Sequence, residues 1–374
     1  MGKRELLIII AFVAIGTVAY QFTAPAATGD RGFSFGKIFS EARKEMRGNP
    51  GSGKYVHKAS IPVPADLREV RLIGVSESVK IVGDSPGDTV DYEFTVNSNG
   101  PDDAEALGYA KDTKLERDDL GDSIVFRAKY PEPASQRSTI LMHVPARLAV
   151  RVESSQGVDI SGVAAVHLEA IRSTVKLTKV AGSVTGAQQD GDFTIAEAGS
   201  VKLRLIRSKS AISKVTGGLT LDLRDADSDI SESSGTIEVD EVRSDVSITN
   251  HQGAITVRGN DGGITILRPA AETRVDVRRA EVEVLVERPV AMTIITSDEP
   301  LRLILAGSPA FMLDAAASDA AIQAIEFDLK PEVVEGDAKL SHQFGGKSDV
   351  RITLRNTRGD VILRKNNQRS EKNK

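Results

Sequence analysis

The stretch SDISESSGTIEVDEVRSD, residues 228–245, contains one complete unit of the pattern that decides the fold of this chain. A short strand with one aliphatic residue, Ile230, is followed by a turn that contains Gly235. A second strand alternates aliphatic and acidic residues from Ile237 to Asp240, and a polar turn at Arg243 closes the unit. Because side chains alternate between the two sides of a strand, this pattern directs the aliphatic residues to one side and the charges to the other.

The same residue types recur at intervals of 17 or 18 residues before and after this unit. Four such columns run in phase, which excludes chance as their origin. They are Gly182, Gly199, Gly217, Gly235 and Gly253; Leu177, Ile195, Ile212, Ile230, Ile248 and Ile266; Val201, Leu219, Ile237 and Ile255; and Leu203, Leu221, Val239, Val257 and Val275.

No single unit of this length can bury its own aliphatic side, so the units must stack on one another. The sequence therefore predicts an all-β fold, a β-solenoid or β-helix-like stack of 18-residue rungs. Stacked rungs lie about 4.8 Å apart, so equivalent outward side chains touch. One outward column would be Arg204, Asp222, Asp240, Arg258 and Asp276, a ladder of mostly opposite charges in which the Asp222–Asp240 step is either solvated or holds a cation.

The repeat also allows us to predict how the rest of the chain is divided into regions. We expect residues 56–150 to form an N-terminal β region with a short helix at 102–110, and residues 151–365 to form the solenoid. Residues 350–363 restore the unit and would cap the stack, residues 315–325 would be a loop or a short helix, and residues 366–374 a disordered tail. The pattern leaves open whether the β body is continuous or divides near residue 150.

An apolar run from Leu6 to Tyr20 follows Lys3 and Arg4 at the start of the chain. Its length is at the short end for a transmembrane helix, and we interpret residues 1–27 as an anchor, with a cleavable signal peptide as the alternative. The basic residues before the run favour an N-terminus inside the cell. The body would then be exported, so the sequence predicts a single-pass membrane protein with a periplasmic or extracellular body.

Residues 28–55 would connect this segment to the body. Apolar positions in 32–47 have helical spacing, which predicts a juxtamembrane helix lying either on lipid headgroups or on the body. Residues 48–54, GNPGSGK, are typical of a flexible linker. They also match the start of a phosphate-binding loop, but Tyr55 stands where that motif has Ser or Thr, and no strand pattern precedes them.

Composition excludes several functional classes. The 48 Lys and Arg residues against 53 Asp and Glu residues give a net charge of −5, without the basic footprint that nucleic-acid binding requires. The chain has no cysteine, which excludes disulfides, thiolate metal sites and cysteine nucleophiles. We therefore expect no nucleic-acid partner.

Searches for catalytic and metal-binding patterns give no candidate. The histidines have no metal-ligand spacing, and His143 lies in an apolar strand without a second ligand type nearby. Asp225–Asp229 has the spacing that opens a calcium loop, but Ile230 and Thr236 stand where that loop needs Gly and Glu. No nucleophile elbow is present. We therefore assign no catalytic, cofactor-binding or metal-ligating residues, and no cofactor.

Several short motifs together resemble a known family. They are the strand 79–83 (VKIVG), the acidic helix start at 102–107 followed by the strand 123–126, rungs such as 233–239 (SSGTIEV), and the closing stretch from Ile352 through Gly359 and Asp360 to Leu363. Across residues 56–365 they resemble the bacterial "putative adhesin" family, a domain of unknown function. The resemblance implies a β-solenoid body on a membrane-anchored or exported chain, and it offers no catalytic residues to carry over.

Taken together, these observations favour a non-enzymatic, membrane-anchored envelope or surface protein that presents a β-solenoid for binding or adhesion. Its partners would be the membrane, through the N-terminal helix, and a protein or glycan on the solenoid face. One alternative is a membrane-bound regulator of envelope stress. Another is a polysaccharide-active β-helix enzyme, which would need Asp, Lys or Arg aligned across rungs, whereas the Arg204 column is mixed in charge.

Overall fold

The computed structural model of the protein describes residues 51–132, 135–153, 156–169 and 174–366, which belong to one compact unit spanning Pro50–Lys374. The predicted anchor or signal segment, the juxtamembrane helix and nearly all of the predicted tail lie outside the described residues. Within the described ranges, no helix has the length and apolar character needed to cross a bilayer. The described β body is continuous through residue 150.

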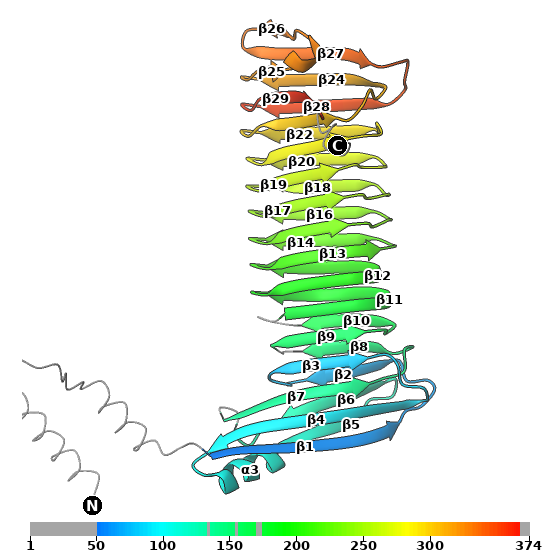
Figure 1. Ribbon diagram of the computed structural model, residues 1–374, viewed down its shortest axis with the longest axis vertical. Coiled ribbons are helices and arrows are strands. Elements are labelled where there is room, and N and C mark those ends of the chain that lie inside the picture. The colour runs from blue at the N-terminus through cyan, green and yellow to red at the C-terminus, as the bar shows by residue number, and fades with distance from the viewer. Residues whose placement is uncertain (1–50, 133–134, 154–155, 170–173, 367–374) are drawn as a thin grey trace, which may run out of the picture. The chain divides into compact units, whose positions relative to one another are not determined.

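Each rung of the stack contributes one strand to each of two parallel sheets that enclose the core (Figure 1). Two long strands, β11 (Thr174–Gln189) and β12 (Asp192–Ile206), run through both sheets. The first sheet also contains β2 (Glu69–Ile73), β8 (Ala149–Glu153), β10 (Ala165–Glu169), β14 (Leu219–Arg224), β16 (Ile237–Val242), β18 (Ile255–Asn260), β20 (Thr273–Arg278) and β22 (Met292–Ser297). The second contains β3 (Ser78–Val82), β9 (Gly157–Ser161), β13 (Lys209–Val215), β15 (Asp227–Ser231), β17 (Asp245–Thr249), β19 (Gly263–Leu267), β21 (Glu281–Val286) and β23 (Leu301–Leu305).

The register confirms the aliphatic columns that the sequence predicts. Ile212 pairs with Ile230, Ile230 with Ile248, and Ile248 with Ile266, and all of them are buried. On the first sheet, the column through Leu221 and Val239 is equally buried. Since each such side chain removes its apolar surface from water at about 25 cal/mol per Å², the stacked columns are the principal source of stability.

The glycine column has a steric cause. At these positions the backbone of one rung rests directly on the backbone of the rung before it. The amide of Gly217 donates to the carbonyl of Gly199 at 2.6 Å, and a Cβ placed on Gly253 would lie only 1.5 Å from the carbonyl oxygen of Gly235. A side chain at this column therefore has no room.

At one corner the chain reverses through residues with positive φ, which alternate in charge along the stack. They are Asp190, Arg207, Asp225, Arg243, Asp261, Arg279, Asp298 and Arg358. The Arg243 guanidinium donates to both oxygens of Asp225 at 2.6 and 2.9 Å, and Arg279 does the same to Asp261 at 2.6 and 2.8 Å. These Arg–Asp pairs lower the pKa of the Asp225 and Asp261 carboxyls, chiefly through the hydrogen bonds. We name this column the corner charge ladder.

The N-terminal end of the stack is closed by antiparallel strands and a helix (Figure 1). The second sheet continues into β7 (Gln136–His143), β4 (Thr89–Gly100) and β1 (Gly51–Pro62), and the first into β6 (Ser123–Lys129) and β5 (Lys114–Asp119). Helix α3 (Asp103–Asp112) is capped at its N-terminus by Asp102, whose side chain accepts a hydrogen bond from the Glu105 amide at 2.8 Å. It confirms the short helix that we predicted there.

The described part of the predicted linker is strand instead. Residues 51–54 lie in β1, and the reason is the close approach of α3. A Cβ on Gly51 would lie 1.9 Å from the carbonyl carbon of Asp102, and one on Gly53 would lie 2.4 Å from that of Ala106. These glycines permit backbone contact with the helix. The glycines of this segment therefore serve close packing and do not make a flexible linker.

The last rung of the sequence is not the last rung of the stack. Strands β28 (Arg351–Thr357) and β29 (Val361–Lys365) insert between β22 and β24 (Phe311–Ser318), and between β23 and β25 (Ile322–Gln323), respectively. The end is formed by β24 with β27 (Asp337–Phe344), β26 (Glu332–Val334) and the short helix η1 (Ile325–Phe327). Our prediction that 350–363 would cap the stack is therefore wrong.

The alanine-rich segment is also different from the expected loop or helix. Ala315 and Ala317 point into the core from β24, which pairs with β28 on one side and β27 on the other. Alternation of buried and half-buried residues along β24 shows that small side chains can satisfy the strand period.

Candidate functional site

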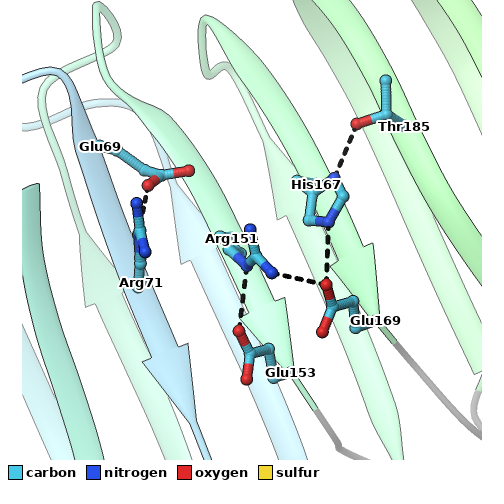
Figure 2. Close-up of polar contacts among 7 residues, drawn as sticks. All are labelled: Glu69, Arg71, Arg151, Glu153, His167, Glu169 and Thr185. Atoms are coloured by element: carbon cyan, nitrogen blue, oxygen red, sulfur yellow. Dashed lines mark hydrogen bonds and ion pairs between the residues drawn. The ribbon is translucent and has the colours of Figure 1, made fainter.

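Outward side chains of β8, β10 and β11 form a connected polar network (Figure 2). The Arg151 guanidinium donates to Glu153 at 3.0 Å and to Glu169 at 2.5 Å. On the other side of Glu169, Nε2 of His167 lies 3.3 Å from the same carboxylate oxygen, and Nδ1 of His167 lies 2.9 Å from the hydroxyl of Thr185. We call these five residues the His167 network.

The parallel register explains why these residues meet. Arg151 pairs with His167, and His167 pairs with Thr185, so the three lie in one outward row. Glu153 pairs with Glu169 in the neighbouring row. Because adjacent rungs are about 4.8 Å apart, long side chains in the two rows reach one another.

The row continues to the rung before it, where Arg71 on β2 pairs with Arg151. Arg71 donates to Glu69 at 2.5 Å, on its own strand, which offsets the adjacency of two like charges (Figure 2). The side chains of Arg151 and Glu169 are 28% and 50% exposed, so the network is open to an approaching molecule while its geometry is held by several partners.

A shallow hollow of about 350 Å³ continues the surface on the following rungs. It is lined by Thr185, Lys202, Arg204, Thr220, Asp222 and neighbouring residues. In the second row, Ala187 lies between Glu169 and Arg204. The His167 network and this hollow together form what we call the binding surface.

The Arg204 column lies in the predicted register. Arg204 is 3.3 Å from Asp222, which Arg224 also approaches at 3.3 Å, and Arg258 is 4.0 Å from Asp240. Asp222 and Asp240 are neighbours, but no group of three or more acidic or histidine side chains in the described ranges has the geometry of a metal site. These exposed pairs favour solvation of the column, at about 0–1 kcal/mol per pair.

His143 and Asp225, to which the sequence gives no metal-binding role, each interact with an oppositely charged or ionisable side chain. Nδ1 of His143 is 2.6 Å from the Asp84 carboxylate at the end of β7. Asp225, the first position of the incomplete calcium-loop pattern, turns the corner and is bound by Arg243. The absence of catalytic residues stays a prediction from the sequence.

Sequence patterns alone did not reveal the His167 network. Its members are distant along the chain, and Arg151 and His167 precede the region where the repeat is clearest. A signal was nonetheless present, because Glu153 and Glu169, like Arg151 and His167, share one spacing within alternating strands. Only the register shows that the two pairs face the same side.

Comparison with known proteins gives similarities to solved structures only. No family model and no curated protein matches the chain. Among solved structures, a "putative cell adhesion protein" from Clostridium sporogenes has 10% identity, covering 85% of this chain and 100% of that chain, with a TM-score of 0.19. A "putative adhesin" from Parabacteroides distasonis has 9% identity, covering 83% and 97%, with a TM-score of 0.35. One from Parabacteroides merdae has 12% identity, covering 82% and 95%, with a TM-score of 0.27. The two Parabacteroides structures are named putative adhesins, as is the family that the sequence motifs resemble.

Proposed function

We propose that this chain is a non-enzymatic envelope or surface protein, held to the membrane by its N-terminal segment, that binds an exported protein or glycan on the binding surface. The observation that carries the proposal is the continuity of polar groups from Arg71 to Asp222 on the outward side of the first sheet. Their side chains combine cationic, anionic and hydroxyl groups within reach of one extended partner.

The stack favours binding because its polar groups are preorganised. Each side chain is fixed to a rung by the backbone ladder and by the buried columns beneath it, so little ordering remains to be done when a partner arrives. An extended polymer with groups at strand spacing could contact several rungs at once, and multiple weak contacts then add up.

Replacing Arg151 with alanine tests this surface. The change leaves Glu153 and Glu169 without their shared cation, and we expect at least about a tenfold loss of affinity, equivalent to about 1.4 kcal/mol. The full-length protein in detergent would be used to capture envelope proteins and to probe an array of envelope glycans. Captured partners would then be titrated against wild type and variant.

Lys176→Ala is the matched control for this experiment, because Lys176 is exposed on the second-sheet half of β11. It should bind like the wild type. Equal affinity of the Arg151 variant would remove the binding surface from the proposal, and turnover of a glycan by the purified protein would overturn the non-enzymatic assignment.

The membrane part of the proposal has its own test. We expect the mature protein to retain residues 1–27 and to sediment with membranes in alkaline carbonate, because the apolar run is long enough to anchor it. Intact mass of the isolated protein measures retention directly. A mass that lacks these residues would show a cleaved signal peptide, whereas protease protection of the body in spheroplasts would contradict its export from the cytoplasm.

A further inference from the structure

Glu241 lies in the interior of the stack, in a row of apolar residues. Leu205 and Leu223 precede it on β12 and β14, and Gly259 and Val277 follow it on β18 and β20. Its side chain is 1% exposed, as buried as the leucines on the rungs before it. A carboxyl group thus occupies a core position in the middle of the stack.

The carboxyl group is poorly satisfied there. Its Oε2 accepts a hydrogen bond from the Ser244 amide at 3.3 Å, and Oε1 has no hydrogen-bond partner among the described residues. Removing a charged carboxylate from water without full compensation is costly, so burial favours the neutral form.

The next rung is shaped around this group. A Cβ on Gly259 would lie 2.5 Å from Oε1 of Glu241, and a Cβ on Gly262 would lie 2.9 Å from Oε2. The absence of side chains at both glycines makes the space that the carboxyl group fills. The contact between the rungs of β16 and β18 therefore depends on a titratable group packed against backbone.

The charges around Glu241 do not stabilise its ionised form. Asp245 at the start of β17 and Asp261 in the turn after β18 repel a negative charge, while Arg243 and Arg279 are already paired with Asp225 and Asp261. Burial, with these two acids adding to it and the Ser244 amide opposing it, raises the pKa of Glu241 to about 7.

We propose that Glu241 is an ionisation switch built into the stack, which keeps the rungs of β16 and β18 closed when protonated and opens their corner to water when it loses its proton. The inference goes beyond the proposed binding function, because the switch lies in the core and acts whatever partner the binding surface takes. It gives the body a pH-dependent weak point between two otherwise continuous halves of the core.

The direction of the effect follows from linkage. Between pH 4.5 and about 7 the folded protein holds a proton on Glu241 that the unfolded chain has released, so its contribution to stability falls as pH rises through this window. Above about pH 7 the loss is complete. His251, buried at another corner, acts oppositely: burial lowers its pKa, and stability is lost as pH falls through the ordinary histidine range.

Hydrogen exchange of the full-length protein in detergent tests the switch. After correction for intrinsic rates, we expect amides of β16 and β18 in the wild type to exchange about tenfold faster at about pH 8.5 than at about pH 6, because about one pH unit of the raised pKa of Glu241 lies within this interval. Amides of β22 should show no such change. Both Glu241→Gln and Glu241→Leu should abolish the faster exchange at the higher pH.

The matched control is Glu238→Gln, because Glu238 is exposed on the same strand and should leave the pH dependence intact. Persistence of the faster exchange at the higher pH in either Glu241 variant would overturn the proposal. Should both variants fail to fold, carbon-13 NMR of glutamate-labelled wild type decides it: a carboxyl carbon titrating near neutral pH supports the switch, and normal titration of every glutamate rejects it.

Discussion

Replacing Gly253 with alanine is expected to destabilise the protein by more than about 4 kcal/mol, the range reached when a core backbone contact is broken. The added Cβ would lie 1.5 Å from the carbonyl oxygen of Gly235, and 2.5 Å from its carbonyl carbon. Neither atom can move away easily, because the adjacent Gln252 amide is bonded to the Ser233 carbonyl at 3.0 Å. The rungs must separate at this turn, and the columns beneath them lose contact.

Gly218→Ala is the control, since it adds the same atom to the same kind of turn. The nearest heavy atom to its Cβ would be the Thr236 hydroxyl at 3.7 Å, an ordinary contact. Urea denaturation of both variants measures the difference in free energy of unfolding. Similar stabilities would show that backbone stacking does not explain the glycine column.

The comparison of these two glycines shows what the sequence could reveal about the fold. The spacing of Gly217, Gly235 and Gly253 was sufficient to predict the repeat, and the aliphatic columns in phase with it predicted the core. The cause of the glycine column needed coordinates. A turn glycine that supplies a positive φ and one that makes room for a carbonyl look identical in sequence.

The order of the rungs could not be predicted from the sequence, for a different reason. Ile352 and Leu354 satisfy the same buried columns as Met292 and Ile294, and so do Leu313 and Ala315. A repeat specifies which residues a rung presents to its neighbours, but it does not specify which rung becomes its neighbour. The insertion of residues 351–365 before residues 311–323 therefore leaves no trace in the periodicity.

The candidate site was hidden by the same property. Alternation identifies Arg151 and His167 as outward residues, but which outward residues touch depends on the register between rungs. Glu241 is the opposite case. It follows Leu205 and Leu223 at the repeat spacing, so its column predicts a buried position, whereas its residue type predicts an exposed one. The column predicts the buried position of Glu241 correctly, and the residue type does not.

Deleting residues 219–254, two units of 18 residues, is expected to give a shorter protein that still folds cooperatively. Gly218 would join Ile255, so that Leu203 stacks on Val257 and every aliphatic column continues. Since each rung contacts only its neighbours, stability should fall by the missing interfaces alone. Circular dichroism and urea denaturation measure this, with an m-value reduced in proportion to the lost surface.

Two shorter deletions separate the contributions of the core and of the corner charge ladder. Deleting residues 219–236 keeps the aliphatic register, but it places Arg207 beside Arg243, and Arg243 loses its partner Asp225. We therefore expect a lower urea midpoint than for the deletion of residues 219–254, although the stack is longer, and the difference should be clearest at low salt.

Deleting residues 219–235 shifts the strand by one position, turns its aliphatic residues to solvent and should prevent folding. If that variant folded as well as the two-unit deletion, the shared core would not depend on strand register. The order of the three variants in stability therefore measures how strictly the 18-residue interval, and not composition alone, specifies this fold.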